Sequence, residues 1–159
     1  GKSNRIPSGN DALFPGFRTC VLANHWLDDG EGRIRRARLM DLLRRHFHLV
    51  LESCRIGMGQ PDPGIYSRAL EELQAEPREA ILLDEVPENL EQARELGMAT
   101  ILVRDTDTAL TELEKLSGLQ VGIPGIPLIP GIPEGAGVSR WGFLGFLSFL
   151  GFLRELECP

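Results

Sequence analysis

The sequence predicts an α/β fold in which helices flank a parallel β-sheet. Short apolar runs, the pattern of buried strands, recur at 18–23, 49–51, 80–83 and 99–103. Stretches with apolar residues at helical spacing separate these runs. Strands that alternate with helices form βαβ units, so we expect a Rossmann-like parallel sheet.

The helices of this core follow from their start and stop signals. An amphipathic pattern predicts a helix at 33–46. Pro63 suits the first turn of a helix that ends near residue 73, and Gly97 suits the end of a helix at 88–96. A last helix is expected at 107–116. The acidic loop before it could offer metal ligands, although helix capping by Asp107 or Thr108 explains it more simply.

The chain divides into four regions. Residues 1–16 are polar and predict a loop or disordered N-terminal segment, and residues 17–118 form the α/β core. Residues 119–140 are a Gly/Pro-rich linker, because glycine and proline at this density oppose regular structure. Residues 141–159 are an apolar tail, for which we expect irregular structure that packs on the core or aggregates.

Composition limits the partners and the compartment. The net charge of −6 argues against a nucleic-acid partner. The apolar stretch of the tail is shorter than the roughly 20 residues that a membrane helix needs, so membrane contact is not the favoured role. Three widely spaced cysteines match no metal pattern and favour a reducing, cytoplasmic location. The first residue is Gly, so the chain can be a fragment of a longer protein.

Two adjacent carboxylates, Asp84 and Glu85, come directly after the apolar run at 80–83. The carboxyl ends of parallel strands are where open α/β sheets bind ligands, and a pair of carboxylates suits Mg²⁺. The alternative is a pair of solvated carboxylates at the start of the next helix, whose N-terminus favours negative charge. The residues alone leave both interpretations open.

Further motifs extend this pattern along the core. The stretches 16–29, 52–66 and 83–116 contain the sequences ARELGM at 93–98 and DTDTAL at 105–110. Together they resemble the haloacid dehalogenase-like hydrolases, and more closely the N-terminal phosphatase domains of bifunctional soluble epoxide hydrolases. The resemblance covers about residues 16–120. It implies Mg²⁺-dependent hydrolysis of phosphomonoesters, with a phosphorylated small molecule or lipid phosphate as substrate, in the cytoplasm or peroxisome.

The resemblance also assigns a site and shows what has changed in it. It implies that Asn24 binds phosphate and that Asp84 and Glu85 hold Mg²⁺, with Glu85 as the direct ligand. Ala23 and Gln60 occupy the positions of a phosphate-binding hydroxyl and a lysine. No Asp-x-Asp strand end, which would carry the nucleophile, precedes residue 17.

These replacements predict an inactive isolated chain. Loss of one electrostatic stabiliser costs ~10²–10³-fold in rate, and no covalent intermediate can form without the nucleophile. We therefore expect no retained catalytic residue. The alternatives to a phosphatase fragment are a non-catalytic structural or dimerisation module, or a membrane-associated adaptor that uses the apolar tail.

The missing strand has a structural consequence as well. In the family it lies between the strands that correspond to 18–23 and 80–83. Its loss either exposes strand edges or forces the sheet to pair differently. Exposed edges favour association, so we expect the chain to be marginally stable, a homo-oligomer or dependent on a partner.

Overall fold

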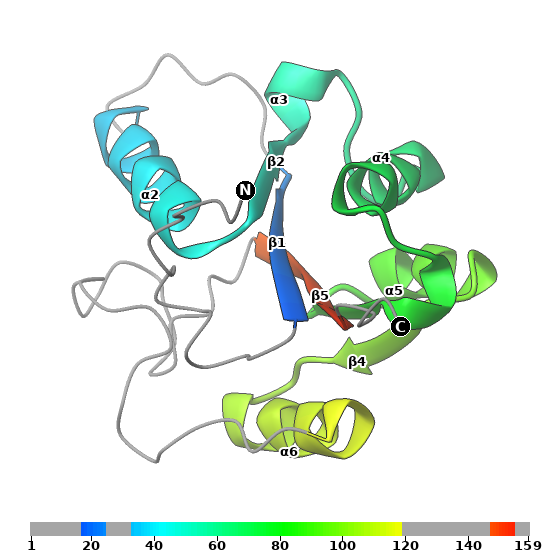
Figure 1. Ribbon diagram of the computed structural model, residues 1–159. Helices are drawn as coiled ribbons and strands as arrows, with labels where there is room; N and C mark the ends of the chain where they lie inside the picture. The colour runs from blue at the N-terminus through cyan, green and yellow to red at the C-terminus, as the bar shows by residue number, and fades with distance from the viewer. Residues whose placement is uncertain (1–16, 25–32, 119–146, 155–159) are drawn as a thin grey trace, which may run out of the picture.

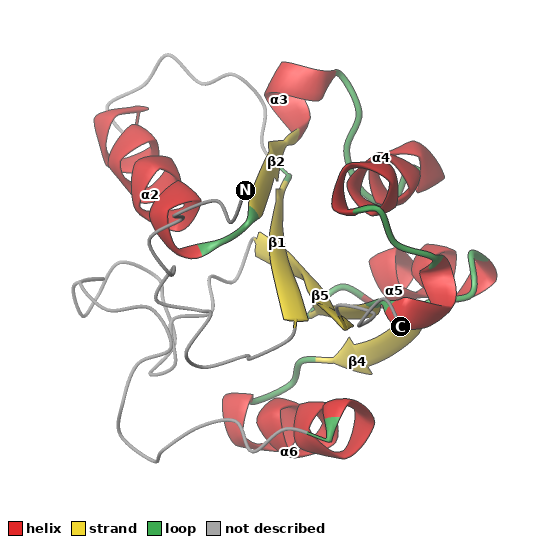
Figure 2. Cartoon of the chain, in the orientation of Figure 1, coloured by secondary structure: helices red, strands yellow, loops and turns green. Residues whose placement is uncertain are grey.

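The computed structural model describes residues 17–24, 33–118 and 147–154. The predicted α/β class is confirmed, with five strands in one sheet and helices on both of its faces (Figures 1 and 2). The elements, in chain order, are β1 (Phe17–Ala23), α2 (Arg33–His46), β2 (Leu49–Glu52), α3 (Ser53–Ile56), α4 (Pro63–Leu73), η1 (Pro77–Glu79), β3 (Ile81–Asp84), α5 (Pro87–Glu95), β4 (Ala99–Leu102), α6 (Thr106–Ser117) and β5 (Leu147–Arg154).

The sheet has the strand order β2-β1-β5-β3-β4. The pairs β1–β2 and β3–β4 are parallel, as the sequence predicts, and each is linked by helices that cross over the sheet. β5 is antiparallel to both of its neighbours, β1 and β3. The sheet is therefore mixed, with a parallel pair on each side of an antiparallel centre.

β5 corrects one expectation about the apolar tail. The sequence predicts irregular structure throughout 141–159, whereas residues 147–154 form a strand. The stretch lies between β1 and β3, and these two strands supply backbone hydrogen-bonding partners that the isolated sequence lacks. The N-terminal segment, the linker at 119–140 and the remainder of the tail lie outside the described residues.

Two hydrophobic layers cover the two faces of the sheet. Val21 and Leu83 face a layer built with α2 and α6, whereas Leu22 and Leu82 face a layer built with α4 and α5. Successive side chains of a strand point to opposite faces, so neighbouring residues of β1 and β3 enter different layers. None of the helices in the described ranges is long and apolar enough to span a bilayer.

The helix ends follow local side-chain chemistry. Pro63 begins α4, and the Asp62 side chain accepts a hydrogen bond from the Gly64 N–H at 2.8 Å. Asp105, rather than Asp107 or Thr108, is the N-cap of α6, because its side chain accepts hydrogen bonds from the Thr108 N–H and hydroxyl, each at 2.8 Å. These bonds stabilise the carboxylate and lower the pKa of Asp105. Gly97 follows α5 with φ of 97°, as expected for a residue after a helix.

Candidate functional site

The candidate site lies at the carboxyl ends of β1, β2 and β3. Pairing places Ala23 of β1 opposite Glu52 of β2 on one side and Leu147 of β5 on the other. Asp84 ends β3 and pairs with Leu102 of β4. The strand ends therefore bring the predicted positions Ala23, Asn24, Asp84 and Glu85 to one edge of the sheet.

Asp84 organises the turn that leads from β3 into α5. Asp84 is 4% exposed, and its Oδ1 accepts a hydrogen bond from the Val86 N–H at 2.8 Å. Oδ2 accepts a hydrogen bond from the Asn89 side-chain amide, also at 2.8 Å. A buried carboxylate is stable only when such donors replace its water shell. Asp84 thus fixes the backbone that presents Glu85, whose side chain is exposed.

Asn24 and Gln60 meet at the end of β1. The Asn24 side-chain amide donates to the Gln60 carbonyl oxygen at 3.0 Å, and Gln60 itself is 7% exposed. A Cβ on Gly59 would lie 2.2 Å from the Asn24 Oδ1 atom. Only a glycine at position 59 therefore lets the Asn24 side chain reach this position.

Tyr66 links the two halves of this network. Its buried hydroxyl lies 3.2 Å from Gln60 Oε1 and 3.0 Å from the Asn89 carbonyl oxygen, both of which can accept its proton. Burial raises the pKa of Tyr66, and the negative charge of Asp84 raises it further. The phenol consequently stays protonated and acts as a hydrogen-bond donor.

The structure thus joins Asn24 and Gln60 to Asp84 through two residues that sequence reasoning did not identify, Tyr66 and Asn89. The sequence contained one indication for Tyr66: it is the sole tyrosine of the chain, and it lies within one of the motifs that carry the resemblance. Asn89 is a polar residue that is 7% exposed in the first turn of a helix, a feature that only packing reveals.

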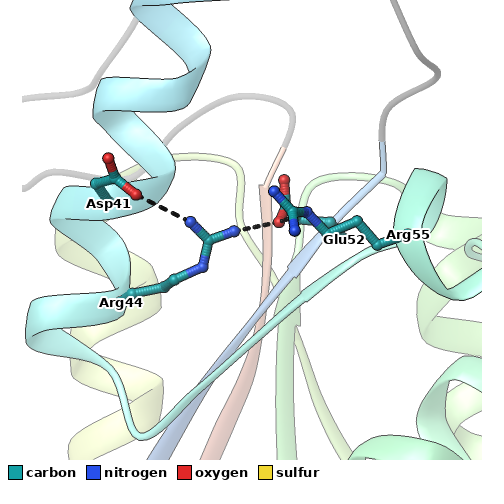
Figure 3. A network of polar contacts seen from close by, with 4 residues as sticks. All are labelled: Asp41, Arg44, Glu52 and Arg55. Atoms are coloured by element: carbon teal, nitrogen blue, oxygen red, sulfur yellow. Dashed lines mark hydrogen bonds and ion pairs between the residues drawn. The ribbon is translucent and has the colours of Figure 1, made fainter.

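A second polar network lies beside β2 (Figure 3). Glu52 is 7% exposed and pairs with Arg44 of α2 and, at 2.7 Å, with Arg55 of α3. Arg44 also pairs with Asp41 at 3.1 Å. The two arginines neutralise the buried carboxylate and tie both helices to the end of the strand next to Ala23.

Within the described residues, the side chains at this site could supply only some of the ligands that a divalent cation needs. In the three described ranges, no three His, Cys, Asp or Glu side chains gather to hold a metal ion. Mg²⁺ often binds proteins through one or two carboxylates and takes its other ligands from water and substrate. Exposed Glu85 beside the fixed Asp84 fits that minimal role, because one carboxylate is free to turn toward a cation while the other holds the backbone in place.

Comparison with known proteins identifies the family. Residues 57–122 match the family described as HAD-hydrolase-like. The chain is also 57% identical over 113 residues to bifunctional epoxide hydrolase 2 from Sus scrofa, which covers 70% of this chain and 20% of that protein. Residues 57–122 belong to the haloacid dehalogenase-like hydrolases. The resemblance found in the motifs is thereby confirmed.

Two further proteins are similar to this chain. Acyl-CoA dehydrogenase family member 10 from Mus musculus is 41% identical over 112 residues, which cover 69% of this chain and 10% of that protein. The chain thus spans a fifth or less of the length of these curated relatives. A solved, uncharacterised protein from Corynebacterium glutamicum has a TM-score of 0.53 and 23% identity, covering 65% of this chain and 73% of that one, which supports the shared fold.

Proposed function

We propose that this chain is a non-catalytic form of a haloacid dehalogenase-like phosphatase domain. The ancestral reaction is Mg²⁺-dependent hydrolysis of a phosphomonoester, with lipid phosphates as the substrate class. The matched family and the relatives named epoxide hydrolase support the hydrolase origin. The arrangement of the central strands supports the loss of activity.

The observation that carries this proposal is the position of Leu147. It lies opposite Ala23 at the carboxyl end of β1, on the side that faces β3. The resemblance places the nucleophile at the end of the strand between β1 and β3, a position that β5 occupies here, and a covalent mechanism of phosphoryl transfer needs that nucleophile. Neither Ala23 nor Leu147 carries a nucleophilic or hydrogen-bonding side chain, so this pair of strand ends offers nothing that attacks phosphorus.

The remaining polar groups support binding of ions more than turnover. Glu85, positioned by Asp84, would hold Mg²⁺, and Asn24 would lie close to a phosphate at the same edge. When bound, Mg²⁺ neutralises the negative charge of phosphate oxygens. Gln60 can donate hydrogen bonds but supplies no positive charge, so phosphate would bind weakly.

A phosphatase assay on the full chain tests the loss of activity. We expect no hydrolysis of p-nitrophenyl phosphate or of a lysophosphatidic acid above background, with or without Mg²⁺. Mg²⁺-dependent turnover that disappears in Asp84→Asn would overturn the proposal.

Calorimetric titration with Mg²⁺ tests the residual site. Weak binding should be lost in Glu85→Gln and retained in Glu88→Gln, which removes another exposed carboxylate from the first turn of α5. Equal loss of binding in both variants would show general charge attraction and exclude a site at Glu85.

A further inference from the structure

The carboxyl end of β2 carries an excess of positive charge. Glu52 contributes one negative charge, and the guanidinium groups of Arg44 and Arg55 both bind its Oε2 atom (Figure 3). Asp41 also pairs with Arg44, but its side chain is 67% exposed, so water screens its charge. The buried carboxylate therefore leaves one of the two arginine charges unbalanced.

Arg55 is the more exposed of the two arginines. Its side chain is 71% exposed, and it binds Glu52 through Nε at 2.7 Å. A guanidinium that binds a carboxylate through Nε keeps its two terminal NH₂ groups as hydrogen-bond donors. These groups lie in one plane, a geometry that matches two oxygens of a phosphate group.

The short helix that carries Arg55 begins beside Asn24. β1 and β2 are paired up to their last residues, and Asn24 and Ser53 follow directly on the two neighbouring strands. A Cβ on Gly59 would lie 2.2 Å from Asn24 Oδ1 and 3.1 Å from Ser53 Cβ, so both side chains approach the same glycine. Arg55 is two residues further along this helix, α3. The ends of β1 and β2 thus bring an amide donor and an exposed guanidinium to the same part of the sheet edge.

We propose that Arg55 and Asn24 together bind the phosphate group of a phosphomonoester. This inference rests on the function proposed above, in which phosphate binds at the same edge, and it names the source of positive charge. Gln60 is not that source, because its side chain is neutral and its Oε1 atom lies 3.2 Å from the buried Tyr66 hydroxyl. Arg55 would supply the charge from the end of β2, the strand next to β1.

Glu52 would hold Arg55 in place and would not contact the ligand. Its carboxylate is buried and fixes the Nε atom of Arg55, so the arginine loses less side-chain freedom when its terminal nitrogens bind an anion. The positive charge of this site comes from a side chain, so phosphate should bind without Mg²⁺. Binding should weaken as the salt concentration rises, because ions screen an exposed guanidinium.

Nuclear magnetic resonance titration of the full chain with inorganic phosphate tests this site, in a buffer that contains EDTA and no Mg²⁺. We expect saturable shifts of the side-chain N–H signals of Arg55 and Asn24, with a dissociation constant on the order of 1 mM. Glycerol 3-phosphate should cause the same shifts and glycerol none, which would assign the binding to the phosphate group. Arg55→Gln should weaken binding about tenfold, and Arg55→Lys should weaken it less, because lysine keeps the charge and loses the planar pair of donors.

Arg78→Gln is the matched control for Arg55→Gln. Arg78 also binds a glutamate through Nε, at 2.8 Å from Glu76 Oε2, and its side chain is 80% exposed. It lies in η1, which precedes β3 and is therefore at the opposite end of the sheet. Both variants lose the same charge, so general charge attraction would weaken phosphate binding equally in the two.

Asn24→Asp separates a failure of this inference from a failure of the proposed function. It replaces an amide donor at the same edge by a carboxylate, which repels phosphate, and it should weaken binding at least as much as Arg55→Gln. Weaker binding in Asn24→Asp with unchanged binding in Arg55→Gln would refute the role of Arg55 and leave a phosphate at the edge. Equal affinities in Arg55→Gln and Arg78→Gln, or no saturable shift at ~20 mM phosphate, would also overturn the proposal.

Discussion

Tyr66→Phe tests whether the polar network at the strand ends stabilises the fold. The substitution removes one hydroxyl group and keeps the ring, so packing around the fully buried side chain changes little. It removes one hydrogen-bond donor, which lies 3.2 Å from Gln60 Oε1 and 3.0 Å from the Asn89 carbonyl oxygen.

The size of the effect follows from burial. A buried acceptor that loses its donor costs about 1–3 kcal/mol, and the two acceptors here share one proton. We therefore expect the free energy of unfolding to fall by about 2 kcal/mol, which lowers the melting temperature of a chain of this size by roughly 4–8 °C.

Urea denaturation followed by circular dichroism at 222 nm measures this change. The urea concentration at the midpoint of unfolding should fall. The dependence of the free energy of unfolding on urea concentration should change little, because nearly the same surface is exposed on unfolding. Thr111→Val is the matched control, since it removes an exposed hydroxyl that donates to the Asp107 carbonyl oxygen at 2.9 Å, and it should cost less than about 0.5 kcal/mol. A loss in Tyr66→Phe no larger than in this control would refute the reasoning.

Three further predictions use the same unfolding measurement. Gly59→Ala should lower the free energy of unfolding by about 1–3 kcal/mol, because its Cβ would lie 2.2 Å from Asn24 Oδ1. Gly64→Ala in α4 should lower it less, because the nearest atoms to its Cβ, Asp62 Oδ1 and Met58 Sδ, lie 3.1 Å away; the reverse order would contradict the close approach at Gly59. Glu52→Gln should lower the free energy of unfolding by about 1–2 kcal/mol, since it removes a buried ion-pair partner. Asp41→Asn, at the exposed end of the same network, should lower it by less than about 0.5 kcal/mol. Stability should fall as the pH rises above the ordinary pKa of Tyr, 10.0, because burial raises the pKa of Tyr66 and so favours the protonated phenol in the folded state. Above pH 10, Tyr66→Phe should reduce the fall in the free energy of unfolding with pH, by at most about 1.4 kcal/mol per pH unit. An unchanged pH dependence in this variant would contradict the role of Tyr66.

The placement of the candidate site residues at the strand ends was predictable from the sequence, but the hydrogen bonds between them were not. Apolar runs that end in Asn24 and in Asp84-Glu85 place these residues at strand ends, and parallel strands bring such ends to one edge. The link between them depends on Tyr66, Gln60 and Asn89, whose contacts arise only when α4 packs against α5. Periodicity within one element contains no information on such contacts between elements.

The ion pairs of Glu52 show the same limit. In the sequence alone, the arginines of 33–46 are typical of a helix face exposed to solvent, and Arg55 lies in a short helix that no pattern predicts. The structure places Arg44 and Arg55 on either side of one buried carboxylate. Their pairing depends on the packing of α2 on the sheet, to which Met40 and Leu43 contribute.

The sequence by itself determined the α/β class, the parallel pairs, most helix boundaries and the family, because each depends on local periodicity, helix-end residues or short motifs. Only the tertiary structure decided the centre of the sheet. The run at 147–154 has apolar residues but no partner within its own neighbourhood, so its conformation depends on the gap between β1 and β3. Strand pairing joins residues more than a hundred positions apart, as between Ala23 and Leu147, and hydrogen bonds over that separation exist only in the folded sheet.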